Sequence, residues 1–205
     1  MFDRILKVLV AIALFAGGPW GSANIGDSPP SAREEAATGK FLVATKAMGD
    51  PRFKESVILL LNHGRDGSFG LIVNRPTSFS LSEILTTPFS PIIARTLYVG
   101  GPVQPIVLSM LIHSEQPLTD AVPLIANTYY VVGTNRVVAV ATNFELVADS
   151  ARIYAGYAGW ASGQLNAEIA RGSWLVTAGD ADTVFSAAPE RVWEMLTKKL
   201  SGTWL

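Results

Sequence analysis

The stretch ARIYAGYAGWASGQLNAEI, residues 151–169, decides the fold of this chain. Its first nine residues predict a strand, and Leu165 and Ile169 then share one face of a helix. Glycines between the two elements allow the backbone to turn tightly, and Ser162 is expected to cap the helix. Trp160 is the largest side chain in this turn, so we expect it to anchor the turn by being buried.

Runs of β-branched and apolar residues predict further strands on both sides of this stretch. They fall at residues 41–45, 56–63, 70–76, 96–103, 107–113, 128–133 and 173–177. The second of these runs is apolar over most of its length, which is typical of a strand buried on both faces. Residues 135–144 (NRVVAVATNF) fit either a strand or a short helix.

Two further segments predict helices. Ser80 and Glu83 have the spacing of a capping box, and apolar residues follow the serine. Residues 189–202 carry an apolar stripe and end in basic residues, as a terminal helix does. Strands nevertheless outnumber helices, so the sequence predicts one α/β domain of mixed α+β character, with a mixed sheet covered by a few helices.

The amino terminus has the pattern of a secretory signal. Arg4 and Lys7 precede an apolar run at 8–16, which is too short to span a bilayer comfortably, and small residues follow. We expect residues 1–23 to be a signal peptide, 24–39 a flexible linker rich in Pro, Ser and charge, and 40–205 the folded domain. The protein would then be periplasmic or secreted. An uncleaved anchor or a mis-assigned start codon is the alternative.

Composition excludes several classes of protein and site. The chain has 16 basic and 17 acidic residues, a net charge of −1, and no cysteine. A nucleic-acid binder normally has a basic excess or a basic stripe, and neither is present, so we expect no nucleic-acid partner. Without cysteine there is no disulfide, thiol nucleophile or lipid anchor. Any contact with a membrane would be through the signal peptide only.

No catalytic, metal or cofactor motif is complete. GWASG has its serine in the wrong register for a nucleophile elbow, so Ser162 is better explained as a helix cap. His63 and His113 are the only histidines, and each lies near a strand end where a structural hydrogen bond is the common role. Asp180 and Asp182 lack a full ligand set at a recognised spacing. We expect no metal and no cofactor, and the catalytic residues, if any, are unknown.

Three loops at predicted strand ends form the candidate ligand site. They are NRP at 74–76, GGP at 100–102 and the turn at 156–164, and a sheet can deliver such loops to one edge. Arg75 would supply a fixed cation and the helix start free amides, which together favour an anion. The candidate binding residues are Asn74, Arg75, Gly100, Gly101, Tyr157, Trp160, Ser162, Gly163 and Gln164. In the alternative interpretation, Arg75 forms an internal salt bridge and Gln164 only closes the corner.

Four motifs in one order carry a resemblance to a known family. The motifs are GKFLVATKAMGDPRFKESVILLLNHGRDGSFGLIVNRP, LYVGGPV, VLSMLIH and GYAGWASGQL. Together they resemble the YqgE/AlgH family of bacterial proteins over residues 39–193. The resemblance implies a single α/β domain with a bent mixed sheet and no established activity. It also implies a cytoplasmic location, from which the signal peptide departs, and an acidic residue where this chain has Asn166.

Three functional hypotheses follow. The first is a non-enzymatic binding or regulatory module that takes a small anionic ligand or a protein partner at the strand-end loops. The second is a hydrolase built on His63 or His113 together with Ser162, Asn74 or Arg75. The third is a transcriptional regulator, which the acidic balance and the export signal oppose. A ligand screen and an esterase or phosphatase panel would separate the first two.

Overall fold

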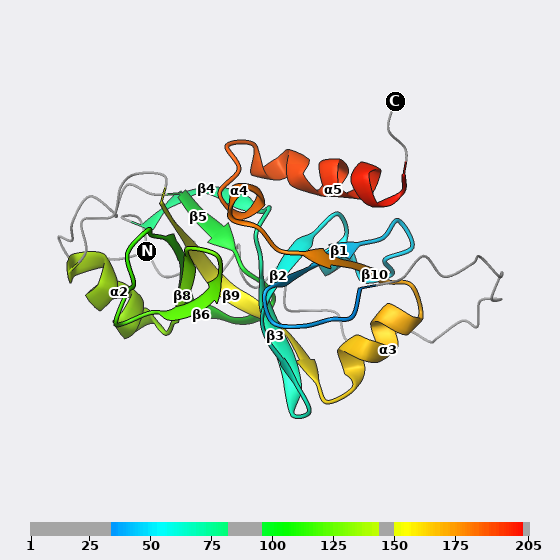
Figure 1. Ribbon diagram of the computed structural model, residues 1–205, viewed down its shortest axis with the longest axis horizontal. Helices are drawn as coiled ribbons and strands as arrows, with labels where there is room; N and C mark the ends of the chain where they lie inside the picture. The colour runs from blue at the N-terminus through cyan, green and yellow to red at the C-terminus, as the bar shows by residue number, and fades with distance from the viewer. Residues whose placement is uncertain (1–33, 82–95, 144–149, 203–205) are drawn as a thin grey trace.

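The computed structural model describes residues 34–81, 96–143 and 150–202. The signal peptide expected at 1–23, most of the expected linker and the helix expected after Ser80 lie outside the described residues. The predicted class is confirmed, because a mixed α/β domain with a curled, largely antiparallel sheet and a few helices forms (Figure 1).

Ten strands make up the sheet, in the order β10-β1-β2-β3-β9-β6-β8-β7, with β5 joining β9 and β4 joining β5. All pairs are antiparallel except β5 with β9. The strands are β1 (Lys40–Ala44), β2 (Val57–Gly64), β3 (Gly67–Ile72), β4 (Pro76–Ser80), β5 (Thr96–Val99), β6 (Val103–His113), β7 (Val122–Ile125), β8 (Thr128–Val132), β9 (Ala151–Ala161) and β10 (Trp174–Ala178).

Strand β9 is the centre of the sheet and is the strand predicted from the opening stretch. Its first half pairs with β5 and β6, and its second half pairs with β3. Gly156 lies where the partners change, in a left-handed conformation with φ 69°. A β-carbon on Gly101 would lie 2.1 Å from the carbonyl carbon of Tyr157, so glycine is required where these two backbone segments cross.

The sheet curls so that its concave face encloses a core. Phe41, Leu59 and Tyr154 are fully buried members of this core and come from β1, β2 and β9. At the far ends of the strand order, the side chain of Ile125 lies close to Gly39, just before β1. The curl therefore brings β7 back toward the opposite end of the sheet, close to the start of β1.

A few short helices cover this sheet (Figure 1). They are η1 (Pro51–Phe53), α2 (Thr134–Asn143), α3 (Gln164–Ala170), α4 (Ala181–Val184), η4 (Pro189–Arg191) and α5 (Val192–Leu200). The ambiguous segment at 135–144 is thus helical where it is described. Helix α5 buries Val192 and Leu196 against the concave face, as its apolar stripe predicts. Within the described part of the chain, no helix is both long and apolar enough to cross a membrane.

Strand β6 carries a large bulge opposite the glycine crossing. Val103 pairs with Tyr157 and Leu108 pairs with Ala155, so five residue steps on β6 face two steps on β9. Gln104 within the bulge has φ 45°, a left-handed conformation that few non-glycine residues adopt. The bulge therefore pushes a short segment of β6 out of the ladder.

Candidate functional site

The end of β9 is held by a closed aromatic cluster. Trp160 is 6% exposed, which confirms its predicted burial, and its ring centroid lies 6.2 Å from Phe53 and 6.0 Å from Trp174. Glu168 Oε2 accepts hydrogen bonds from both indoles, at 2.9 Å from Trp160 Nε1 and 2.8 Å from Trp174 Nε1. The indole N–H groups of both tryptophans are therefore hydrogen-bonded within the protein and are not available to a ligand.

The expected cap at Ser162 is wrong. Gly163 occupies the cap position of α3 with φ 72°, while Ser162 Oγ donates to the carbonyl of Arg65 at 2.6 Å. Gln164 Oε1 accepts from the amide of Ala161 at 3.1 Å, and its Nε2 donates to Glu168 at 3.1 Å. The side chain of Gln164 therefore closes the corner, as the alternative interpretation held.

Asn74 and Arg75 are used to hold the turn around η1. Asn74 is 6% exposed, accepts from the amide of Val57 at 2.8 Å and donates to the carbonyl of Glu55 at 2.9 Å. The guanidinium of Arg75 donates to the carbonyls of Arg52 and Lys54. Burial lowers the pKa of Arg75, and the nearby carboxylates of Asp50 and Glu55 oppose this shift. Arg75 thus serves backbone carbonyls, where the sequence analysis expected a ligand or a salt bridge.

Gly100 and Gly101 allow the backbone after β5 to cross close to β9. A β-carbon on Gly100 would lie 2.3 Å from the carbonyl oxygen of Gly156, so this backbone must approach β9 closely. The structure therefore brings the GGP and GYAGW motifs together, as expected, but as a packed contact. The NRP motif lies next to the GGP motif, since the amide of Val99 donates to the carbonyl of Arg75 at 2.9 Å and Pro76 pairs with Tyr98, but the side chain of Arg75 is bonded to the carbonyls on either side of Phe53.

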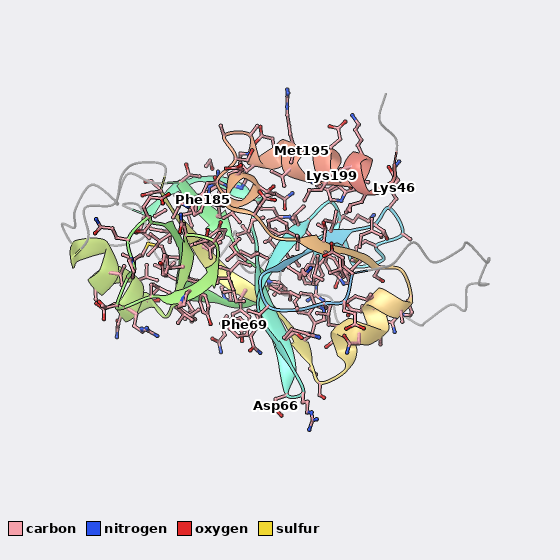
Figure 2. All side chains as sticks on the ribbon, viewed as in Figure 1. Lys46, Asp66, Phe69, Phe185, Met195 and Lys199 are labelled. Carbon is pink, nitrogen blue, oxygen red and sulfur yellow. The ribbon has the colours of Figure 1, made fainter. Side chains whose placement is uncertain are left out.

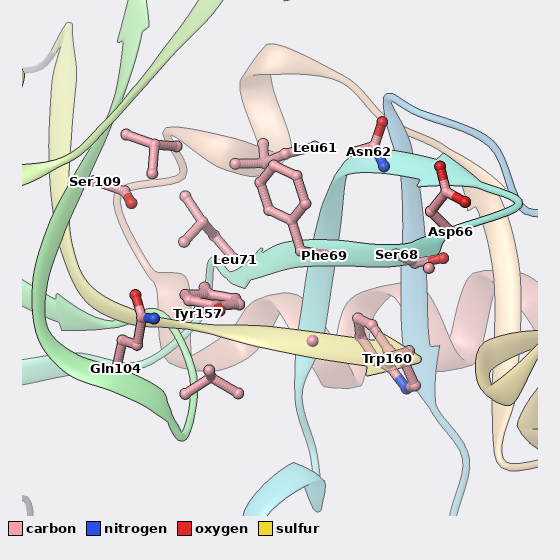
Figure 3. A pocket seen from close by; sticks show the side chains of 14 residues that line it. Leu61, Asn62, Asp66, Ser68, Phe69, Leu71, Gln104, Ser109, Tyr157 and Trp160 are labelled. Carbon is pink, nitrogen blue, oxygen red and sulfur yellow. The ribbon is translucent and has the colours of Figure 1, made fainter. Parts of the chain in front are cut away.

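A cavity of about 610 Å³ lies beside this crossing, between the β2–β3 hairpin, β9 and the bulge of β6 (Figure 3). Tyr157 and Trp160 of the predicted site contribute to its walls, and Arg75 and Gln164 do not. Phe69 and Tyr157 meet edge to face there, with ring centroids 6.2 Å apart. The described residues that line it are Leu61, Asn62, Asp66, Gly67, Ser68, Phe69, Leu71, Val103, Gln104, Ser109, Val132, Tyr157, Gly159 and Trp160.

The sequence did not indicate the residues at the rim of this cavity. Gln104 lines it with its strained backbone, and Ile106 in the same bulge is 78% exposed. On the opposite side, Asp66 lies at the tip of the β2–β3 hairpin, away from Phe69 (Figures 2 and 3). The one available signal was the proline in VQPI, since proline inside a strand marks a bulge or an edge.

The histidines have separate surroundings. His63 Nδ1 lies 2.7 Å from Ser68 Oγ, and Ser68 lines the cavity. His113 Nε2 lies 3.5 Å from Glu115 Oε1, and its ring packs on Phe185 at 6.0 Å. The hydroxyl of Ser162 is bonded to a carbonyl instead, so the expected pairing of a histidine with Ser162 is absent from the described chain.

Metal ligands are not gathered anywhere in residues 34–81, 96–143 and 150–202, where no group of three or more His, Cys, Asp or Glu side chains could hold an ion. Asp180 caps α4 by accepting from the amide of Thr183 at 2.7 Å. Its carboxylate therefore has a structural role.

Comparison with known proteins identifies relatives over most of the chain. A family model described as AlgH-like matches residues 41–205. A UPF0301 protein of Streptomyces avermitilis is 36% identical over 168 residues, covering 79% of this chain and 86% of the relative. A UPF0301 protein of Ruegeria pomeroyi is 36% identical over 176 residues, covering 80% of this chain and 91% of the relative.

Two solved structures share the fold. The solution structure of the AlgH protein from Pseudomonas aeruginosa has a TM-score of 0.66 and 26% identity, over 88% of this chain and 94% of that chain. A crystal structure of a protein from Corynebacterium diphtheriae has a TM-score of 0.66 and 24% identity, over 84% of this chain and 94% of that chain. The second likeness bears on the fold alone.

Proposed function

Since this chain belongs to the AlgH-like family, whose relatives' names here state no activity, we propose its function from the geometry of its own cavity. The protein is a non-enzymatic binding module. The observation that carries the proposal is the 610 Å³ cavity, which joins an aromatic wall to a few polar side chains. Cavities of this size with apolar walls and a few polar groups are typical of small-molecule sites.

The walls define the class of ligand. Phe69 and Tyr157 offer ring faces and edges, and buried Ser109 and exposed Asn62 offer hydrogen-bonding groups. Asp66 is the one charged side chain among the described residues of the wall, and it is acidic. The cavity therefore suits a ligand with an aromatic or aliphatic body and a neutral or cationic polar edge. The anion expected from the sequence would be repelled here.

A fragment screen by ¹H–¹⁵N NMR on the full-length chain tests this proposal. Aromatic fragments should shift the amide signals of Phe69 and Tyr157. Phe69→Ala should weaken their binding about tenfold or more, because it removes one ring from the wall. The matched control is Phe79→Ala on β4, which replaces another partly buried ring outside the cavity wall. If no fragment shifts these signals, or Phe69→Ala binds as the native chain does, the cavity is not a ligand site.

One observation favours a hydrolase as a second candidate. Ser68 Oγ lies within hydrogen-bond distance of His63 Nδ1 and lines the same cavity, as a nucleophile and its base would. Within the described part of the chain, however, the ring of His63 makes no hydrogen bond to a carboxylate that would orient it. The pair therefore lacks the third group of a catalytic triad.

Covalent labelling separates the two candidates. A hydrolase should react with a fluorophosphonate probe at Ser68, and both Ser68→Ala and His63→Gln should abolish labelling. Ser78→Ala, which changes an exposed serine of β4, is the control and should label as the native chain does. A binding module should show no labelling in any of the four proteins.

Export is part of the proposal and rests on the amino-terminal pattern. Cleavage after Ala23 would release a chain that begins at Asn24. Amino-terminal sequencing of the protein from its native cells should therefore start at or near Asn24. Soluble protein that retains Met1 would contradict export.

A further inference from the structure

Buried polar atoms without partners gather at the start of β9. Within the described residues, four buried side-chain atoms make no hydrogen bond: His113 Nδ1, Arg152 Nη1, Tyr154 Oη and Thr197 Oγ1. The first three belong to the paired strands β6 and β9, whereas Thr197 is on α5. Native proteins leave few buried polar atoms without hydrogen bonds, so three in one place indicate that another group supplies their missing partners.

These three side chains share the concave face of the sheet. Arg152 pairs with Leu111 in the β6–β9 ladder, and residues two apart on a strand point to the same side. Arg152 and Tyr154 therefore lie on one face with His113, which is two residues beyond Leu111. The same face carries Tyr98, which pairs with Tyr154.

Ring contacts join the three side chains into one cluster. The Arg152 Cζ atom lies 4.8 Å from the ring centroid of Tyr98, and the rings of Tyr98 and Tyr154 are 5.4 Å apart. Phe185, just after α4, lies 6.0 Å from Arg152 Cζ and 6.0 Å from the ring of His113. Aromatic faces thus surround the guanidinium on two sides.

Only one of the two terminal nitrogens of Arg152 makes a hydrogen bond within the described residues. Its Nη2 donates to the carbonyl of Ser186, while Nη1 is buried with no acceptor. No carboxylate of the described residues forms an ion pair with it. A buried cation normally has a counter-ion, because leaving it unpaired is costly.

Tyr154 keeps its proton and can donate. It is fully buried, and this burial raises the pKa of its hydroxyl well above the ordinary value, although the nearby charge of Arg152 acts in the opposite direction. The guanidinium of Arg152 also lowers this pKa as a nearby donor, but the contact between the two side chains does not satisfy either Arg152 Nη1 or Tyr154 Oη.

A second cavity leads to this cluster from outside. It has a volume of about 320 Å³ and opens beside α4, where Phe185 lies (Figure 2). The described residues that line it are His113, Ala181, Asp182, Phe185, Ser186 and Ala187. Phe185 and Ser186 therefore line the cavity and also contact Arg152.

We propose that Arg152, Tyr154 and His113 form a binding site for a small carboxylate, entered through this second cavity when the ring of Phe185 turns aside. One carboxylate oxygen takes the bond from Arg152 Nη1, and the other takes the bond from Tyr154 Oη. The aromatic rings of Phe185 and Tyr98 contact the body of the ligand. The site is separate from the 610 Å³ cavity and needs none of its residues.

Local charge selects a monoanion. Asp182 lines the entrance, and the charge of Glu190 raises the pKa of Tyr98, so one carboxylate lies at the entrance and another near the aromatic wall of the site. The guanidinium of Arg152 carries one positive charge, which balances a single negative charge on the ligand. A phosphate dianion would meet repulsion from both acidic groups with no second fixed cation to offset it.

The test uses benzoate, with benzamide as its neutral isostere and inorganic phosphate as the dianion. Titration calorimetry on the full-length chain should detect benzoate, with binding of benzamide and of phosphate at least tenfold weaker. In ¹H–¹⁵N NMR, benzoate should shift the amide signals of Phe185 and Ser186. Shifts confined to Phe69 and Tyr157 would place benzoate in the other cavity and overturn the proposal.

Variants test the assigned contacts. Arg152→Gln should weaken benzoate binding about tenfold or more, since it removes a hydrogen bond to a charged group. Tyr154→Phe, which loses only the hydroxyl, should weaken it several-fold. Arg191→Gln, the same charge change at an exposed position, should bind as the native chain does.

Several results would overturn the proposal. They are no binding of benzoate, tighter binding of phosphate, or unchanged affinity in Arg152→Gln. If Arg152→Gln does not fold, Tyr154→Phe decides alone, and native affinity in that variant rejects the site. In that case buried water is what completes the three atoms.

Discussion

One charged side chain lies among aromatic rings near each end of β9: Arg152 at its start and Glu168, from α3, near its end. The hydrogen bonding of these two side chains differs. At the end of the strand, Glu168 accepts two indole N–H groups and an amide of Gln164, so the charge and its partners are satisfied. At the start of the strand, Arg152 lies between Tyr98 and Phe185 with one nitrogen unpaired. The first cluster stabilises the fold, and the second keeps bonding capacity for another group.

This difference shows why a cluster of conspicuous residues is a poor guide to a site. GYAGWASGQL is the most unusual motif of the chain, but its polar side chains are used to close the corner before α3. The start of β9 is inconspicuous in the sequence, yet Arg152 Nη1 and Tyr154 Oη have no protein partner within the described residues. Unmet hydrogen bonds, which the sequence does not display, separate the two ends.

The largest expected effect is the loss of the tryptophan at the satisfied end. Trp160→Ala should lower the free energy of unfolding by about 3–5 kcal/mol, because it removes a buried indole and leaves a cavity. Urea unfolding followed by circular dichroism measures this. Met195→Ala, at a side chain that is 51% exposed, is the control and should change stability by less than about 0.5 kcal/mol. A loss below about 1 kcal/mol for Trp160→Ala would mean that the cluster does not anchor the strand.

The next effect isolates the charge in the same cluster. Glu168→Gln should cost about 1–3 kcal/mol, because the two indoles then donate to a neutral amide oxygen instead of a carboxylate, and Gln164 Nε2 loses its acceptor. Urea unfolding again gives the value. Glu190→Gln, at an exposed carboxylate, should be close to neutral. Equal stability of the two variants would show that the negative charge of Glu168 adds nothing to the cluster.

At the unsatisfied end, removal of a polar group should have the opposite sign. Tyr154→Phe should raise the free energy of unfolding by about 1 kcal/mol, because its hydroxyl is buried without a partner. Thermal unfolding without added ligand tests this, with Tyr129→Phe on β8, which pairs with β6 and not with β9, as a control. A loss of stability would mean that the hydroxyl is bonded in solution and that the two ends are alike.

The smallest effect lies at the edge of the tryptophan cluster, in the turn that holds Phe53. Burial raises the pKa of Asp50, but the hydrogen bonds and charge of Arg52 outweigh it, so the pKa of this carboxyl is lowered. A lowered pKa stabilises the fold above the unfolded-state value, and this stability is lost as the pH falls through the folded-state value. Asp50 is partly exposed, so the contribution should be only a few tenths of a kcal/mol.

Comparing unfolding at pH 7 and near pH 3 tests this effect. Asp50→Asn should lose less stability than the native chain between the two values. Asp66→Asn at the hairpin tip is the control and should follow the native chain. An Asp50→Asn curve that parallels the native curve would contradict the assignment.

Local patterns were sufficient for most of the elements. Alternation and β-branching predicted β1, β2, β6, β8, β9 and β10, and an apolar stripe predicted α5. They were insufficient for 135–144, where β-branched residues form α2 because one face buries Val137 and Val140 against the sheet. The bulge of β6 was also missed, because its register depends on the partner strand.

For the candidate site too, the sequence indicated some features and not others. Tyr157 and Trp160 were rightly placed beside the glycine loops, since large side chains among glycines must fill the space at a turn. The use of Arg75 was beyond the sequence, because a guanidinium binds a carbonyl or a ligand according to what the fold puts within reach. The same holds for Arg152, whose neighbours come from separate elements.

What the sequence determined by itself is most of the strands, the terminal helix α5, the family, and the glycines required where two backbone segments cross. These follow from side-chain periodicity and backbone sterics, which act over a few residues. Only the tertiary structure decided which polar atoms remain unpaired. Hydrogen-bond satisfaction depends on groups far apart in the chain, as Arg152 and Ser186 are, and these meet only when the sheet curls and α4 covers it.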